Sequence, residues 1–172
     1  MNQRIDTENG TRPTRPWCLF QSGQSSYAIG LESVAEIVEF DRLVRLPQSP
    51  PRLAGLCVLR RDVLPIVGLE TTPPAETEEH RDRHLVLILK TSQGSWGIEV
   101  AAEGTVVAEE PLEAAPGRSD DVQPWFTLLG LVHRGESTYS AIDPEGTWQQ
   151  VRRGVESYYA GNWVDDTRAR RD

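Results

Sequence analysis

The feature that most constrains this chain is a repeated pattern of short apolar runs. Ten runs of about four to eight residues, rich in Val, Ile and Leu, are separated by Gly, Pro, Ser or acidic residues. Such a rhythm is typical of β-strands that pair into a barrel or a sandwich. It predicts an all-β domain with strands at residues 17–22, 26–31, 36–40, 53–59, 62–67, 84–90, 95–100, 105–110, 126–133 and 137–142.

Two tight hairpin turns indicate that the chain is built from two halves, with the polar segment 71–83 between them. Gly23 and the pair Gly94-Ser95 tolerate the backbone angles of hairpin turns, and they lie between strands in residues 17–31 and 84–100. We expect these two hairpins to be equivalent openings of a first barrel, mainly residues 17–70, and a second barrel, mainly residues 84–142. The polar segments 71–83 and 111–124 are expected to be loops.

Helix features are confined to the C-terminal part of the chain. Asp143 can cap a helix, Pro144 suits its first position, and apolar residues recur from Trp148 at three- and four-residue spacing. The sequence predicts a helix over residues 143–160 that packs across the barrels. Residues 1–16 are expected to be a disordered leader, and residues 161–172 a charged tail.

The charge and the hydropathy pattern exclude several functional classes. A net charge of -8 opposes binding to nucleic acid or to an anionic membrane. The sequence contains neither a signal peptide nor a run of roughly 18 apolar residues, so we expect a cytoplasmic protein without membrane insertion. Cys18 and Cys57 lie inside apolar runs and are expected to be buried free thiols.

The residues that could carry catalysis do not form a known arrangement. His80 and His84 are four residues apart, but they span a loop and a strand, and no cysteine pair completes a ligand set with His133. The sequence shows neither a nucleophile motif nor a phosphate-binding loop. Asp143 is expected to be a helix cap. We therefore predict no catalytic residue, no metal and no cofactor.

The segment from Tyr27 to Leu69 resembles the first half of CheW-like proteins, the coupling proteins of bacterial chemotaxis-type signalling. The second half is similar at residues 86–100, 128–130 and 141–143, so that the resemblance spans about residues 17–160. The matching motifs of the first half are Val34 and Glu36, Leu46-Pro47 with Pro50, Gly55, Leu59-Arg60, and the run Leu64 to Val67.

The resemblance implies a pair of intertwined five-stranded barrels like SH3 domains. It implies a non-enzymatic adaptor that joins the regulatory domain of a CheA-type histidine kinase to the cytoplasmic tip of a methyl-accepting receptor or to other CheW-like domains. The positions carried over to the receptor side are Val34, Glu36 and Arg60, and Arg61 is their neighbour.

The residues themselves leave two interpretations open at each position. Arg60 and Arg61 should project from a hairpin turn, where they either bind a carboxylate of a partner helix or are solvated. Val34 and Ile37 form an apolar knob or belong to the core, and the core is the expectation for Ile37. Glu36 faces a partner or solvent.

Departures from the family pattern keep other functions open. The family typically has glycine where this chain has Arg61, aspartate where it has Gly68, and Val-Asp where it has Val100-Ala101. A first alternative is an auxiliary CheW-like protein that binds the kinase or other CheW-like domains but no chemoreceptor. A second alternative comes from another class: the chain is a β-barrel that binds a small molecule, or it is itself a cryptic enzyme.

Overall fold

The computed structural model describes residues 15–22, 24–47, 49–50, 52–69, 84–101, 105–112, 114–115 and 126–168. Each predicted strand is present, with ends shifted by a few residues. A short additional strand, β9, lies in the segment that was predicted to be a loop. The strands are β1 (Arg15–Ser22), β2 (Ser25–Gly30), β3 (Val34–Phe40), β4 (Leu53–Leu59), β5 (Asp62–Val67), β6 (His84–Thr91), β7 (Gly94–Val100), β8 (Val106–Leu112), β9 (Ala114–Ala115), β10 (Leu128–Arg134) and β11 (Ser137–Ile142), followed by helix α1 (Pro144–Arg168).

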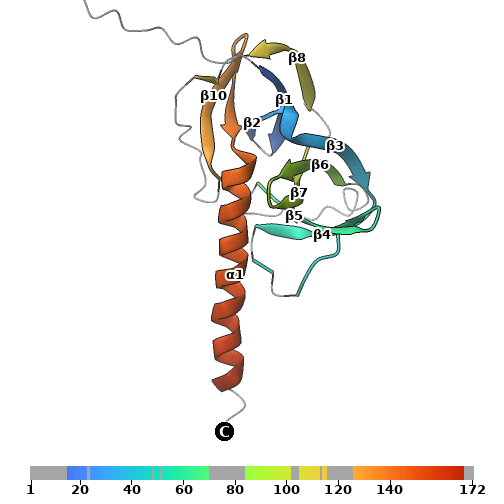
Figure 1. Ribbon diagram of the computed structural model, residues 1–172, viewed down its shortest axis with the longest axis vertical. Helices are drawn as coiled ribbons and strands as arrows, with labels where there is room; N and C mark the ends of the chain where they lie inside the picture. The colour runs from blue at the N-terminus through green and yellow to red at the C-terminus, as the bar shows by residue number, and fades with distance from the viewer. Residues whose placement is uncertain are drawn as a thin grey trace, which may run out of the picture.

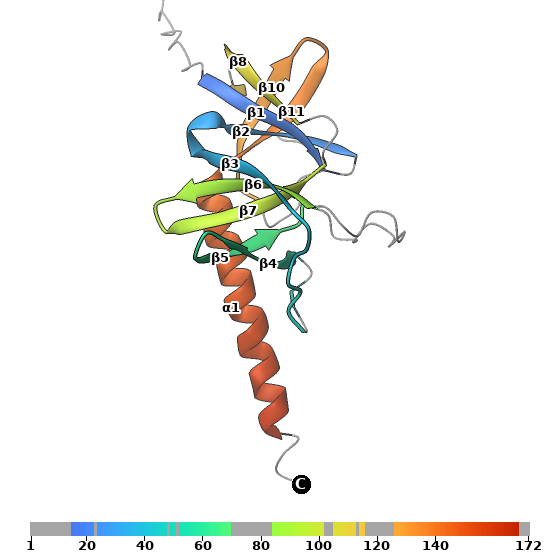
Figure 2. The same cartoon turned by 90° about the vertical axis from the view of Figure 1, so that its right-hand side faces the viewer.

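The strands form two sheets that exchange chain segments (Figures 1 and 2). Sheet A has the order β8-β1-β2-β11-β10-β9, and sheet B has the order β3-β6-β7-β5-β4. In each sheet the opening hairpin of one half pairs with the later strands of the other half. The prediction of intertwined barrels and of two equivalent hairpins is therefore confirmed.

The predicted division of the strands between the barrels is wrong. Residues 17–70 were assigned mainly to one barrel, but β3, β4 and β5 join β6 and β7 in sheet B. The single 3-10 turn η1 (Leu31–Ser33) leads directly from β2 of sheet A into β3 of sheet B. Because β2 is already paired with β1 on one side and β11 on the other, β3 cannot pair with it and instead pairs with β6.

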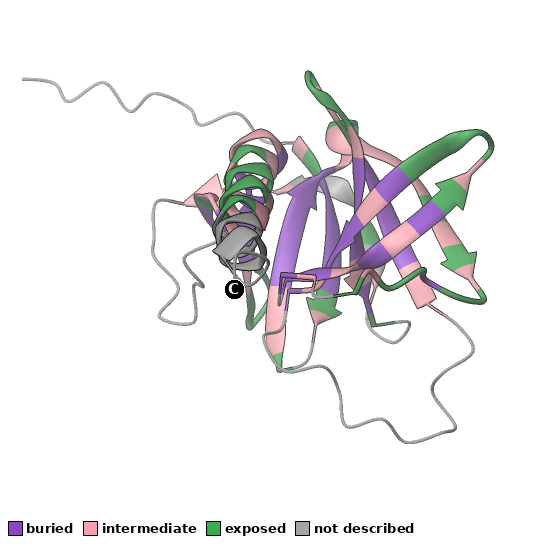
Figure 3. Cartoon of the chain, turned by 90° about the horizontal axis from the view of Figure 1, so that it is seen from below, coloured by how far each residue is buried: buried purple, intermediate pink, exposed green. Residues whose placement is uncertain are grey.

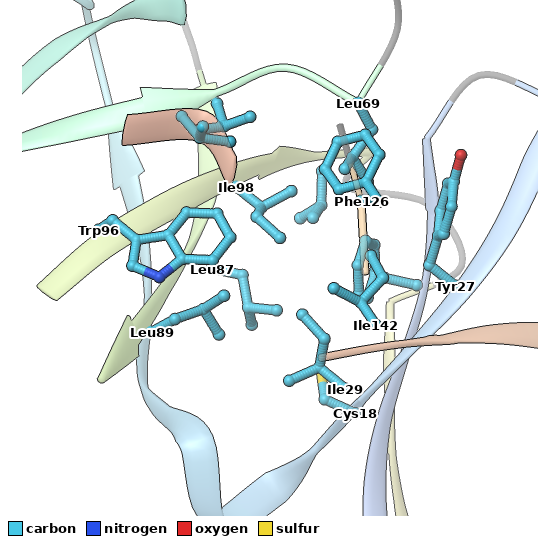
Figure 4. Close-up of a cluster of buried hydrophobic side chains, with 14 residues drawn as sticks. Cys18, Tyr27, Ile29, Leu69, Leu87, Leu89, Trp96, Ile98, Phe126 and Ile142 are labelled. Atoms are coloured by element: carbon cyan, nitrogen blue, oxygen red, sulfur yellow. The ribbon is translucent and has the colours of Figure 1, made fainter. Parts of the chain in front are cut away.

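Period-2 alternation buries both faces of the opening hairpins. On β1, Cys18 and Phe20 point into a central cluster between the sheets, whereas Trp17 and Leu19 point into the interior of sheet A. On β6, Leu87 and Leu89 point into the same central cluster (Figure 4). Figure 3 shows the consequence: strands are buried over their middles and become exposed toward several hairpin tips.

Sheet B closes by a short backbone bridge. The amides and carbonyls of Val44 and Leu56 exchange two hydrogen bonds of 2.8 Å, which joins the connection after β3 to the edge strand β4. A Cβ on Gly55 would lie 2.9 Å from the Val44 carbonyl oxygen. Glycine at this position therefore allows the backbones to approach closely enough to close the sheet.

A buried arginine joins the end of β5 to the second half of the chain. The Arg52 guanidinium donates to the Leu69 carbonyl oxygen and lies 5.8 Å from the Phe126 ring centroid. The Gly68 amide donates to the Arg52 carbonyl oxygen at 3.0 Å. Burial lowers the pKa of Arg52. These contacts hold the segment that leaves β5 against the start of the last hairpin.

Helix α1 begins as predicted and ties the two sheets together. The Asp143 carboxylate accepts a hydrogen bond of 3.1 Å from the Glu145 amide, which is the expected cap. Although the helix follows β11 of sheet A, Trp148 stacks on Trp96 of sheet B with ring centroids 5.8 Å apart. The Ser92 hydroxyl, in the turn between β6 and β7, donates to Glu145 at 3.0 Å.

The helix is longer than predicted. It continues to Arg168, past the expected end at residue 160 and through most of the expected charged tail. Residues 1–14 of the predicted leader and the connector 71–83 lie outside the described residues. Within the described part of the chain, no helix is both long and apolar enough to cross a membrane.

Substituting Gly97 tests the packing inside sheet B. A Cβ at this position would lie 2.6 Å from both Ile66 Cδ1 and Val86 Cγ1. Gly97→Ala should lower the free energy of unfolding by about 1–3 kcal/mol, because the side chains around it are close-packed. Urea unfolding followed by tryptophan fluorescence measures this change.

The Ile66→Val substitution removes one of the two obstructing atoms. It should therefore destabilise Gly97→Ala less than it destabilises the unsubstituted protein. An unchanged unfolding midpoint in Gly97→Ala would contradict this account of the sheet B interior.

Candidate partner-binding surface

Glu36 and Arg60 form an ion pair at one end of sheet B. Glu36 lies on β3 and Arg60 in the turn between β4 and β5, and Arg60 Nη2 is 3.2 Å from a Glu36 carboxylate oxygen. These strands are the two edges of sheet B, so the contact depends on the curvature that brings the edges together. The Arg60 side chain is 78% exposed and that of Glu36 is 30% exposed. Most of the guanidinium is therefore accessible to a partner.

The turn that carries Arg60 and Arg61 has an uncommon backbone. Leu59 pairs with Asp62, so the two arginines form a two-residue hairpin turn. Arg60 has φ of 61° and is the one non-glycine residue with positive φ among the residues that the structure describes. Arg61, at the position where the family has glycine, does not need the left-handed region. The substitution of that glycine is thus compatible with the turn, and the strain falls on Arg60.

The expectation that Ile37 belongs to the core is wrong. Ile37 is 40% exposed, whereas Val34 is partly buried and packs against the central cluster. Ile37 lies opposite Leu87, which points into that cluster, but β3 is the edge strand of sheet B. The cover provided by sheet A ends before it reaches this edge. Ile37, and not Val34, is therefore the more exposed apolar side chain.

A β-bulge in β3 places Glu36 on the opposite side of the strand from Val34, although the two residues are two positions apart. The register passes from Val34 opposite Leu89 to Glu36 opposite Ile88, so Ala35 is the additional residue. Glu36 then shares the inward side of the sheet with Ile88, at the end of the strand. From this position its carboxylate reaches Arg60.

The hairpin of β4 and β5 exposes an apolar surface that the sequence analysis did not identify. We name it the outer valine face, and its residues lie opposite one another in register and alternate with buried ones. Val44, Val58 and Val63 are 57%, 64% and 62% exposed. The complete face is Val44, Leu56, Val58, Val63 and Pro65.

The signal for the outer valine face was present in the sequence. Once Arg60-Arg61 is recognised as a two-residue turn, Val58 must lie opposite Val63 and on the same side of the hairpin. Which side of the hairpin is buried could not be read from the two strands, because both sides carry apolar residues.

Other reactive groups have ordinary structural roles. His84 Nδ1 lies 2.6 Å from a Glu99 carboxylate oxygen, and His133 Nδ1 lies 3.0 Å from the Thr138 hydroxyl. Within the described part of the chain, no three potential ligands form a metal-binding group. His80 lies outside the described residues.

Both cysteines are buried and free, as predicted. Burial raises the pKa of the Cys18 thiol to about 11 and also raises that of Cys57. Because the thiolate is the nucleophilic form, neither side chain is activated for covalent chemistry.

Comparison with known proteins matches residues 16–151 to the family described as the CheW-like domain. The chain belongs to the CheW-like family. The matched region contains both sheets and the first part of α1, and therefore includes the Glu36–Arg60 pair. CheW-like proteins are scaffold adaptors of the coupling type and not enzymes.

Several curated CheW proteins are similar to the chain over most of its length. A probable chemotaxis protein CheW of Rhizobium etli is 26% identical over 109 residues, which are 62% of this chain and 70% of that protein. The chemotaxis protein CheW of Klebsiella aerogenes is 26% identical over 129 residues, or 74% of this chain and 77% of that one.

A solved CheW structure has the same fold. The scaffolding protein TtCheW from Thermoanaerobacter tengcongensis superposes with a TM-score of 0.60 at 16% sequence identity, covering 77% of this chain and 91% of that one. The predicted fold class, two intertwined SH3-like barrels with a C-terminal helix, is thereby confirmed.

Replacing each turn arginine by glycine compares the backbone strain at the two positions. Arg60→Gly should leave the free energy of unfolding within about 1 kcal/mol of the original value, because relief of the left-handed strain offsets the lost exposed ion pair. Arg61→Gly should destabilise by about 0.5–1 kcal/mol, because it adds only freedom to the unfolded chain. Paired urea titrations measure the two changes, and a more stable Arg61→Gly variant would contradict the turn geometry.

Proposed function

We propose that this chain is an adaptor that couples a CheA-type histidine kinase to chemoreceptors. The observation that carries this proposal is the Glu36–Arg60 ion pair, which joins two of the positions that the family resemblance assigns to receptor binding. We propose that an acidic group on a receptor helix binds the exposed guanidinium. Arginine offers five N–H donors in a planar arrangement, so Arg60 can keep its ion pair with Glu36 and also donate to a second carboxylate.

We propose the outer valine face as the contact for the kinase regulatory domain. Val58 and Val63 face each other on one side of the hairpin, and Val44, bridged to Leu56, adjoins them; all three are more than half exposed. Contiguous exposed apolar surface of this kind is characteristic of protein-protein interfaces. The outer valine face lies on the outer side of sheet B, whereas Arg60 lies at the end of the sheet and turns toward Glu36. Because the two surfaces are separate, one adaptor can engage both partners.

The interior of the barrels favours an adaptor over a barrel that binds a small molecule. Sheet A encloses Trp17, Leu19 and Val132, which are at most 1% exposed. Sheet B encloses Ile66 and Ile88, among other apolar side chains. Barrels of this size are filled by their own side chains, which leaves the outer surface to carry the function.

The auxiliary adaptor that binds only the kinase is the second candidate. It is favoured by the loss of the family aspartate at Gly68, whose amide here bonds to the Arg52 carbonyl oxygen. This proposal keeps the outer valine face and removes the receptor contact at Arg60. The two candidates therefore differ in one measurable affinity.

Reversing the charge of Arg60 tests the receptor contact. Arg60→Glu should weaken binding of a receptor-tip fragment by about thirtyfold, or about 2 kcal/mol, because a charge-assisted pair is lost and repulsion is added. Its affinity for the kinase regulatory domain should change by less than about threefold. Isothermal titration calorimetry against both partners measures these affinities, with a thermal melt to confirm folding.

Two matched variants complete this experiment. Arg61→Glu makes the same charge change on the same turn and measures the general electrostatic contribution. Val63→Asp should weaken kinase binding and spare the receptor, whereas Leu129→Asp, an exposed apolar position on sheet A, should spare both. Equal losses toward both partners in Arg60→Glu would refute separate surfaces. Kinase binding without any receptor binding by the unsubstituted protein would select the auxiliary adaptor.

A further inference from the structure

The fold contains the hairpin of the outer valine face twice. The hairpin of β4 and β5 joins β7 through a parallel pairing of β5, and the hairpin of β10 and β11 joins β2 through a parallel pairing of β11. Each hairpin has a register shift at the start of its first strand and a two-residue turn. The first turn residue has φ of 61° at Arg60 and 60° at Gly135. Counted from these turns, every position of one hairpin has an equivalent in the other.

The equivalent positions differ on the outer side of the hairpins. Val58 and Val63 lie opposite each other in sheet B, and His133 and Thr138 lie opposite each other at the same positions of sheet A. All four side chains are exposed. His133 Nδ1 lies 3.0 Å from the Thr138 hydroxyl. Since the same backbone accepts a polar pair in sheet A, the fold does not require the two valines in sheet B.

The two turns differ in charge. Gly135 adopts the left-handed backbone without the strain that a Cβ adds, whereas Arg60 adopts the same backbone with that strain. The second turn residue is Arg61 in one hairpin and Glu136 in the other. The turn geometry therefore requires neither of the two arginines. Their charge beside an exposed apolar face points to a binding partner.

Two arginines border the outer valine face. Arg42 and Val44 alternate with the buried Leu43, so Arg42 shares the outer side with Val44. Arg61 lies in the turn at the other end, two residues before Val63. Both arginines are exposed, and no ion pair joins either one to another of the described residues. The border of the face is therefore positively charged and available.

This border has the opposite charge to the chain as a whole. The segment 41–65 contains five arginines and two aspartates, although the net charge of the chain is -8. At physiological ionic strength, charges farther apart than about 8 Å are largely screened from each other. A partner that touches the face is therefore influenced mainly by the local arginines.

We propose that the outer valine face, together with Arg42 and Arg61, binds a surface of the kinase regulatory domain on which carboxylates border an apolar strip. This inference rests on the function proposed above and specifies the chemistry of the kinase surface. The valines bury against the strip, and each guanidinium donates to a carboxylate beside it. The apolar contact provides most of the affinity, and the charged border favours a partner with the complementary pattern.

A second copy of the chain fits this face less well than an acidic partner. Pairing of the face with itself would place four arginines in one interface, two from each copy. Like charges across an interface weaken binding. The β10–β11 hairpin lies at the opposite end of the body from the β4–β5 hairpin (Figures 1 and 2), so a kinase domain bound to one does not cover the other.

A transplant of the sheet A pair into sheet B tests the apolar contact. The double variant Val58→His, Val63→Thr should fold, because the equivalent backbone holds the same pair in sheet A. It should weaken binding of the kinase regulatory domain by about tenfold or more, because two apolar side chains of the contact are lost. Isothermal titration calorimetry measures the affinity, and a thermal melt confirms folding.

Charge reversal tests the border of the face independently of that transplant. Arg42→Glu and Arg61→Glu should each weaken kinase binding by about three- to tenfold at about 50 mM salt, and by less than about twofold at about 500 mM. Arg153→Glu is the matched control, because it makes the same charge change at an exposed position of α1. It should change the affinity by less than about twofold at either salt concentration. Toward a receptor fragment, neither border variant should differ from this control.

The outcomes separate the border from the proposed kinase contact. Loss of kinase binding in the valine double variant, with arginine variants that bind like the unsubstituted chain at low salt, would overturn the carboxylate border and leave the kinase contact standing. Unchanged kinase binding in every variant would refute the kinase contact itself. Self-association of the unsubstituted chain that the valine double variant abolishes, without kinase binding, would overturn the proposal in favour of a second copy.

Discussion

The burial of both faces of two hairpins organises this structure. β1 and β6 are apolar at successive positions because one side of each strand fills its own sheet and the other side fills the central cluster. The strands in a hairpin's own half of the chain cannot cover the apolar residues on both of its sides. After η1, β3 to β5 join the hairpin of the second half, while β8 to β11 join the first hairpin. The exchange joins the two sheets through one shared central cluster.

The candidate surfaces follow from this exchange. Glu36 and Arg60 are neighbours because β3 and β4 become the two edges of one curved sheet. Sheet A does not cover sheet B as far as these two edges, so Ile37 and the outer valine face are exposed. Surfaces suited to partners thus occur where the packing of the exchanged strands stops, while the interior remains filled by side chains.

Helix α1 joins the two sheets and also provides surface beyond the barrels. Its first turns fasten sheet A to the β6–β7 turn of sheet B through the Glu145–Ser92 contact and the stack of Trp148 on Trp96. Its remaining turns extend away from both sheets. An adaptor gains by such an arrangement, because a rigid body with several independent surfaces can join partners without rearranging.

The sequence by itself determined the strands, the two opening hairpins, the start of α1 at its Asp143 cap and the buried thiols. These features depend on local alternation, turn residues and capping groups, which act within a few residues of the chain. The family motifs added the intertwined fold. Only the tertiary structure decided which strands share a sheet, that Ile37 is exposed while Val34 packs inward, that Arg60 carries the strained φ, and that Val58 and Val63 face outward. Each of these outcomes depends on which distant segment of the chain covers a strand. The identity of an apolar residue does not indicate whether another strand or sheet will cover it.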